Sequence, residues 1–154
     1  MTISILGAGF RVFADSNDLC GMEMYKILIV EDNDNFRQTL RSLLDSRFPS
    51  MSFEEARDGS EALEKVRSFD PHLIFMDIKL PGESGLELTK RIRRSNLKVK
   101  IIILTSYDLP EYREAARVGG ANHFVSKGSC KVEEILALVE TILAEGEEVI
   151  RNNT

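Results

Sequence analysis

The sequence has few cysteines, no long apolar run and no surplus of positive charge. Its two cysteines, Cys20 and Cys130, lie far apart without the spacing of a metal site, so reduced structural thiols are expected. No apolar run approaches the roughly 20 residues that cross a bilayer, so no membrane segment is predicted. The net charge of −5 argues against binding of nucleic acid or of an anionic membrane by this chain alone.

The first residues of the sequence are not expected to form a signal peptide. Residues 1–13 carry no basic leader before their apolar part, and no clear small-residue cleavage site follows. The cytoplasm is therefore the expected location. The 154 residues are enough for one domain, and a composition of 43% hydrophobic and 29% charged residues is ordinary for a globular protein.

From residue 25 onward, short apolar runs alternate with longer segments of helical period. The expected strands lie at residues 27–30, 51–56, 73–76, 99–104 and 122–125, and the expected helices at about 36–49, 62–69, 86–94, 107–118 and 132–142. Most strand runs are apolar throughout, which is typical of parallel strands covered by helices on both faces. The sequence therefore predicts a doubly wound α/β domain with a five-stranded parallel sheet, order 2-1-3-4-5, and five helices.

Two terminal segments fall outside this alternation. Residues 1–24 are expected to form a flexible extension, residues 25–144 the domain, and residues 145–154 a polar C-terminal tail or the remnant of a linker. The glycines at positions 7 and 9 resemble the opening of a dinucleotide-binding turn. The third glycine is absent, however, and no room is left before residue 26 for the helix and strand that would follow. A nucleotide site is therefore not expected.

Residues with reactive or metal-binding side chains follow four of the five apolar runs. Glu31 and Asp32 follow the first run, Asp77 the third, Thr105 the fourth and Lys127 the fifth. Open parallel sheets bind ligands beyond the carboxyl ends of their strands, and the expected order brings the first, third and fourth strands together. Three carboxylates in one pocket raise one another's pKa unless a cation joins them, and oxygen-only ligands favour magnesium. A Mg²⁺ site is therefore predicted here.

Each of these residues taken alone has an ordinary structural explanation. Asp32 could cap the next helix, and Thr105 could cap the helix expected from about residue 108. Lys127 could be a solvated loop lysine. The joint pattern instead favours a reaction site, in which Asp77 is the nucleophile because it stands alone at a strand end after four apolar residues.

The joint pattern resembles the receiver domain of bacterial two-component response regulators, over about residues 25–144. The matching motifs are Val30-Glu31-Asp32-Asn33, Met76-Asp77-Ile78-Lys79-Leu80-Pro81-Gly82 with Gly85-Leu86, Leu104-Thr105-Ser106, and Phe124-Val125-Ser126-Lys127. Gly128 stands where many family members carry proline, and Glu31 where many carry aspartate. The resemblance implies the flavodoxin-like form of the fold. It is strongest to the subgroup with a C-terminal helix-turn-helix, which this sequence does not contain.

The resemblance also implies a function and a role for each site residue. The implied roles are metal binding by Glu31, Asp32, Asp77 and the backbone carbonyl of Lys79, phosphoryl acceptance by Asp77, phosphoryl contacts by Thr105 and Lys127, and switching by Thr105 and Phe124. The implied cofactor is Mg²⁺, and the implied donor is a sensor histidine kinase. The surface of the fourth helix, fifth strand and fifth helix would control an output protein or a missing C-terminal effector domain, with a homodimer as a further candidate. No enzymatic activity is expected beyond self-phosphorylation and autodephosphorylation.

Two alternative functions compete with this interpretation. A magnesium-dependent phosphatase of the haloacid-dehalogenase type needs a second aspartate two residues after the nucleophile, and Lys79 occupies that place. A pseudo-receiver, which binds partners but takes no phosphate, would lack a needed side chain, and all of them are present. Both alternatives are therefore disfavoured.

Overall fold

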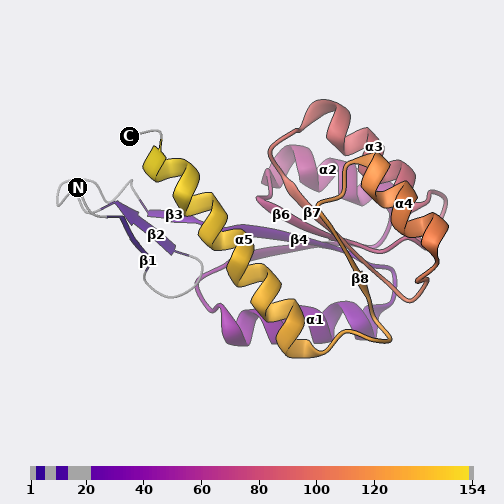
Figure 1. Ribbon diagram of the computed structural model, residues 1–154, viewed down its shortest axis with the longest axis horizontal. Coiled ribbons are helices and arrows are strands. Elements are labelled where there is room, and N and C mark those ends of the chain that lie inside the picture. The colour runs from indigo at the N-terminus through magenta and orange to yellow at the C-terminus, as the bar shows by residue number, and fades with distance from the viewer. Residues whose placement is uncertain (1–2, 6–9, 14–21, 153–154) are drawn as a thin grey trace.

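The computed structural model describes residues 3–5, 10–13 and 22–152 (Figure 1). Its larger sheet contains the parallel strands β4 (Lys26–Val30), β5 (Ser52–Ala56), β6 (Leu73–Met76), β7 (Lys100–Thr105) and β8 (His123–Ser126). Their order in the sheet is β5-β4-β6-β7-β8, which is the predicted 2-1-3-4-5 arrangement. The predicted doubly wound fold is therefore confirmed.

Helices cover both faces of this sheet. Within the described residues they are α1 (Asp34–Arg47), α2 (Gly59–Phe69), α3 (Gly85–Ser95), α4 (Pro110–Gly119) and α5 (Val132–Asn152). One core lies between the sheet and α1 with α5, and the other lies between the sheet and α2, α3 and α4 (Figure 1). Ile27 and Ile29 of β4 face the first core, whereas Leu28 and Val30 face the second. This two-sided burial explains why the central strands are apolar throughout.

The start of α1 is set by an asparagine rather than by the acidic residue before it. The side chain of Asn33 accepts a hydrogen bond of 2.9 Å from the backbone N–H of Phe36, and Asn33 is therefore the N-cap. The capping role considered for Asp32 is wrong. The carboxylate of Asp32 is exposed and remains available for other ligands.

The start of α4 lies later than the sequence pattern predicts. The helix begins at Pro110, and the residue before it, Leu109, has extended backbone angles and makes no side-chain cap. A residue that precedes proline is sterically disfavoured in helical geometry, which explains why the helix does not extend back to residue 107. Thr105 is thus no cap of α4, and that alternative is also wrong.

The terminal segments contain more secondary structure than was predicted. Strands β1 (Ile3–Ile5), β2 (Phe10–Phe13) and β3 (Met22–Met24) form an antiparallel sheet of order β1-β2-β3 within the predicted extension. The first and third of them alternate apolar and polar residues, which is the period of a strand. The glycine pair at 7 and 9 and the cysteine at 20 lie outside the described residues.

At the other end, α5 continues to Asn152, so the predicted tail boundary at residue 145 falls inside a helix. Glutamate and arginine, both good helix formers, occur in this stretch and are compatible with the continuation. Among the described residues, no helix combines the length and the apolar character needed to cross a bilayer.

Candidate functional site

The carboxyl ends of the central strands bring the predicted acidic residues side by side. Val30 of β4 pairs with Met76 of β6, so the residues that follow them, Glu31 and Asp77, are neighbours across the ladder. The ladder continues past the strand ends, because the N–H of Asp77 donates to the carbonyl of Val30 at 3.1 Å. The pairing of β4 and β6 thus extends to the backbone of Asp77.

Three carboxylates gather at this edge of the sheet. One oxygen from each of Glu31, Asp32 and Asp77 lies within 4.8 Å of the others. Glu31 and Asp77 are only 3% and 7% exposed, whereas Asp32 is exposed to solvent. The expected convergence of the three acids is found, and a divalent ion could reach the cluster from the side of Asp32.

Among the described residues, Lys127 is the cation that pairs with the side chains of this cluster. Its ammonium donates to Glu31 Oε1 at 2.9 Å and to Asp77 Oδ2 at 3.3 Å. The side chain is only 13% exposed, so Lys127 is not a solvated loop lysine. The carbonyl of Thr105 accepts from the backbone N–H of Lys127 at 2.8 Å, which ties the end of β7 to the lysine.

The loop that follows Asp77 is folded tightly against the start of α3. The other carboxylate oxygen of Asp77, Oδ1, accepts from the N–H of Ile78 at 2.8 Å, and the carbonyl of Ile78 accepts from the N–H of Gly85 at 2.8 Å. A Cβ atom on Gly85 would lie 1.8 Å from the backbone oxygen of Asp77. Gly85 is therefore required by close approach, and it fixes the backbone that carries the central carboxylate.

Thr105 and Phe124, the predicted switch residues, lie on the neighbouring strands β7 and β8. Thr105 is fully buried at the end of β7, and its hydroxyl oxygen accepts from the N–H of Tyr107 at 3.3 Å. Phe124 of β8 is half-buried against the second core. The guanidinium of Arg113 lies 4.7 Å from the centre of its ring, and Asp108 holds Arg113 with bonds of 2.6 and 2.9 Å.

Lys79 lies two residues beyond Asp77 and is exposed. Its exposed ammonium lies 5.1 Å from the ring centre of Tyr107, two residues beyond Thr105. A bridge pairs Lys79 with Ser84, which closes the loop between β6 and α3. Metal binding by the carbonyl of Lys79 stays a prediction.

Comparison with known proteins assigns the chain to a family. The family model described as the response regulator receiver domain matches residues 27–140, most of the chain. The chain belongs to this family. The chemotaxis protein CheY of Halobacterium salinarum is 31% identical, and the match covers 77% of this chain and 98% of that protein. The transcriptional regulatory protein LnrK of Bacillus subtilis is 35% identical over 80% of this chain, but the match spans only 56% of LnrK.

The chain thus spans about half the length, or less, of several curated relatives; for the Bacillus subtilis regulator YesN the share is 33%.

Solved structures agree on the fold of the receiver domain. A CheY-like receiver from Methanospirillum hungatei superposes with a TM-score of 0.76 at 25% identity, covering 82% of this chain and 98% of that one. The regulator TrrA of Thermotoga maritima, solved in complex with Mg(2+)-BeF, superposes with a TM-score of 0.68 at 34% identity, covering 77% and 99%.

In this receiver domain, the buried environment of Glu31 disfavours its charged form. Burial, followed by the hydrogen bond that a protonated Glu31 would make with Asp77, raises the pKa of Glu31 from 4.5 to about 8, although Lys127 opposes the shift. Glu31 Oε2 is buried and has no hydrogen-bond partner among the described residues. One ammonium therefore does not satisfy the receiver's buried carboxylates, and an oxygen is left for a further ligand.

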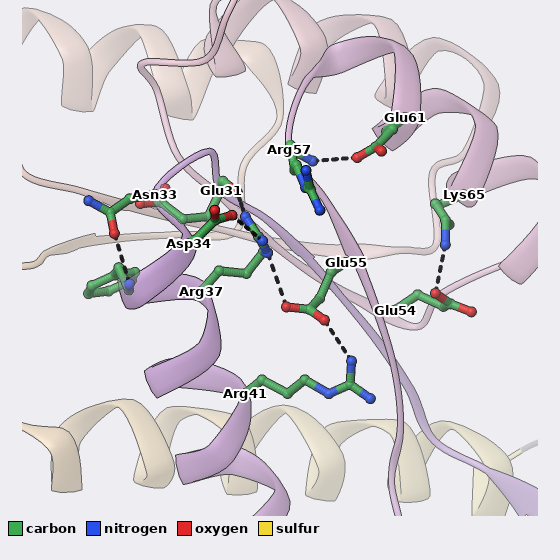
Figure 2. A network of polar contacts seen from close by, with 11 residues as sticks. Glu31, Asn33, Asp34, Arg37, Arg41, Glu54, Glu55, Arg57, Glu61 and Lys65 are labelled. Atoms are coloured by element: carbon green, nitrogen blue, oxygen red, sulfur yellow. Dashed lines mark hydrogen bonds and ion pairs between the residues drawn. The ribbon is translucent and has the colours of Figure 1, made fainter.

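The backbone of Glu31 is held by a network that sequence analysis missed (Figure 2). Arg37 of α1, 5% exposed, donates to the carbonyl of Glu31 at 2.8 Å and to side-chain oxygens of Asp34 and Glu55 at 2.5 and 3.0 Å. Arg41 binds the second oxygen of Glu55 at 2.7 Å. The network joins α1 to β5 and fixes the receiver's β4–α1 loop. In the sequence, the one signal for it is an arginine at position 37, a few residues after the acidic pair.

Proposed function

We propose that this receiver domain accepts a phosphoryl group on Asp77. The observation that carries the proposal is the position of Asp77, whose buried carboxylate lies between two other acids and a lysine ammonium. Asp77 Oδ2 faces Lys127, so negative charge added at this carboxylate would meet a cation already in place. The Mg(2+)-BeF complex of TrrA supports the proposal, as does a Burkholderia pseudomallei regulator, 29% identical, solved with a phosphorylated aspartic acid.

We further propose that Glu31, Asp32, Asp77 and the carbonyl of Lys79 hold Mg²⁺. The residues present fit such an ion, because the donors are all oxygens and Glu31 Oε2 lacks a partner. The ion would supply charge neutralisation for the phosphoryl oxygens. The exposed carboxylate of Asp32 offers the entry side.

The phosphoryl donor in this proposal is a phosphohistidine of a sensor kinase. A carboxylate oxygen of Asp77 attacks phosphorus, the phosphorus–nitrogen bond breaks, and the leaving imidazole takes up a proton. Lys127 then pairs with the new phosphoryl oxygens. The output partner is a C-terminal effector domain or a separate protein, and a second copy of the chain is a further candidate.

Transfer of the signal to the surface depends on Thr105 and Phe124 in this proposal. The hydroxyl of Thr105 turns toward the phosphoryl oxygens, and Phe124 occupies the vacated space, changing the surface of α4, β8 and α5. Shifting such an equilibrium from 1:99 to 99:1 needs about 5.5 kcal/mol. Two or three charge-assisted hydrogen bonds at about 1.5–3 kcal/mol each supply that amount.

The metal affinity should depend on pH through Glu31. Its pKa rises from 4.5 to about 8 on folding, so the metal-free folded state holds a proton in this window that the unfolded state has lost. The contribution of Glu31 to folding stability therefore falls as pH rises from 4.5 to about 8, and Mg²⁺ must displace the proton. We expect Mg²⁺ binding at neutral pH to release protons and to weaken as the pH is lowered. Calorimetry in buffers of different ionisation enthalpy measures the release.

Glu31→Gln is the matched control for this pH dependence. The amide cannot lose a proton in this range, so the proton release should disappear while the fold is kept. An affinity of the wild-type protein that stays constant from acidic to alkaline pH would contradict the assignment of Glu31 as the titrating ligand.

The phosphorylated form should hydrolyse slowly. Lys79 and Tyr107 flank the path of an attacking water, and neither is an acid or an amide able to orient it. We expect a lifetime well beyond seconds, measured as the decay of the phosphorylated mass after the donor is removed. Lys79→Asn supplies an amide and should shorten the lifetime several-fold. A wild-type lifetime of only seconds would refute the prediction.

Incubation with acetyl phosphate and Mg²⁺, followed by intact mass measurement, tests the proposed function. Gain of one phosphoryl group supports a receiver. No gain supports a pseudo-receiver, and turnover of added phosphomonoesters supports a phosphatase.

A further inference from the structure

The ammonium of Lys127 has a third neighbour besides the two carboxylates. It lies 4.0 Å from the ring centre of Phe36, the shortest of the cation–ring contacts among the described residues. With Glu31 and Asp77 at 2.9 and 3.3 Å, the ring completes a pocket that leaves the lysine side chain only 13% exposed. The ammonium is therefore bounded by two carboxyl groups and one aromatic face.

The ring of Phe36 is held in place from two directions. Its backbone N–H donates to the N-cap side chain of Asn33 at 2.9 Å, which fixes the residue in the first turn of α1. Its ring is half-buried and packs against the core between the sheet and α1 with α5. The same turn starts two residues after Asp32. One short segment of the chain therefore supplies both the acidic pair and the ring that contacts Lys127.

We propose that Phe36 is a positioning residue for phosphoryl transfer, whose ring face seats the ammonium of Lys127. The inference rests on the proposed function of Asp77. An aromatic face attracts a cation without offering it a hydrogen-bond acceptor, and the attraction depends little on how the N–H groups point. The ammonium can therefore turn from Glu31 toward a phosphoryl oxygen while it keeps its contact with the ring.

A flexible lysine without this seat would sample other positions. Its four-carbon stem carries large rotamer entropy, and only the two contacts with carboxyl oxygens would remain to hold it. One of them, to Asp77, must rearrange when the carboxylate becomes an acyl phosphate. Phe36 keeps the cation next to the reacting carboxylate during that change.

Graded fluorination of the Phe36 ring tests the electrostatic part of this role. Incorporation of mono-, di- and trifluorophenylalanine at position 36 weakens the negative ring face stepwise and leaves its shape nearly unchanged. We expect the rate of phosphorylation by acetyl phosphate at saturating Mg²⁺ to fall at each step, to about a tenth in the trifluoro protein. Phe36→Tyr, which keeps the face, should retain most of the rate, and Phe36→Leu should lose about as much as the trifluoro protein.

Phe75 provides the matched control. It is 2% exposed, belongs to the same core, and has no cation over its ring among the described residues. The same fluorination series at Phe75 should leave the rate unchanged. In the unphosphorylated wild-type protein, the ring current of Phe36 should also shift the NMR signals of the Lys127 side chain upfield, and Phe36→Leu should remove this shift.

The outcomes separate the two proposals. If the wild-type protein is phosphorylated but the Phe36 series is flat, the ring is only a packing element and the inference is overturned. If the wild-type protein takes no phosphoryl group, the proposed function fails, and the role of Phe36 in transfer fails with it. A missing ring-current shift in the folded protein would show that the Phe36 ring does not contact the Lys127 side chain, and it would overturn the inference whatever the phosphorylation result.

Discussion

Replacement of Asp77 by asparagine is expected to abolish phosphoryl uptake from acetyl phosphate. The amide has nearly the same shape as the carboxylate but is a very poor nucleophile, and loss of a nucleophile lowers a transfer rate by at least roughly a thousandfold. Intact mass measurement should show no phosphorylated species in Asp77→Asn under conditions that convert the wild-type protein. The variant should remain folded, because it removes one buried negative charge beside Glu31, whose pKa the repulsion helps to raise.

Asp45→Asn is the control for this experiment. Asp45 lies exposed on α1, so the same chemical change is made away from the site and should leave phosphorylation unaffected. A phosphorylated mass that persists in Asp77→Asn at the wild-type rate would place the phosphoryl group elsewhere. Denaturation curves of all three proteins separate a loss of the acceptor from a loss of the fold.

Gly85→Ala should produce the largest loss of stability. The added Cβ would lie 1.8 Å from the oxygen and 2.8 Å from the carbon of the Asp77 carbonyl, and 3.1 Å from the side chain of Met76. Backbone atoms cannot yield as a flexible side chain does, so either the β6–α3 loop or the strand end must move. We expect a loss of more than about 4 kcal/mol in the free energy of unfolding, measured with urea. Since domains are stable by only about 5–15 kcal/mol, the variant should be close to unfolded.

Gly128→Ala is the matched control. The nearest atom to an added Cβ there is Ser126 Oγ at 3.9 Å, an ordinary contact, and neither Gly128 nor Gly85 has a positive φ. The control should change the stability by about 0.5 kcal/mol or less. Equal stabilities of the two variants would show that the loop after Asp77 yields easily, and that Gly85 does not fix the position of the carboxylate.

The sequence predicts the sheet well because its central strands are buried on both faces. Continuous apolar runs such as residues 73–76 have a single physical explanation in this context, and the residue after each run must lie at the carboxyl edge. Element ends were predicted less well. The extended geometry that Pro110 imposes on Leu109 decides where α4 begins, and no apolar period reports it. The strands before residue 25 were missed because each has only three or four residues.

The convergence of the acids and Lys127 could also be predicted, but their individual contacts could not. Which oxygen of Glu31 is left without a partner depends on side-chain rotamers and on burial. Which aromatic ring lies next to Lys127 or Arg113 depends on how α1 and α4 are rotated against the sheet. The spacing of residues in the sequence does not determine these rotations closely enough to predict which ring contacts which cation.

The order in which the ribosome makes the pocket has a consequence for its assembly. The contact of Lys127 with Glu31 joins residues 96 positions apart, and Lys127 is the last of the pocket residues to be synthesised. Chains emerge from their N-terminal end, so the nascent polypeptide carries its paired carboxylates before their internal counter-charge exists. Until β8 arrives, only protons or dissolved cations can neutralise them. Synthesis of β8 and of Lys127 after it is therefore the step that supplies the internal counter-charge of the pocket.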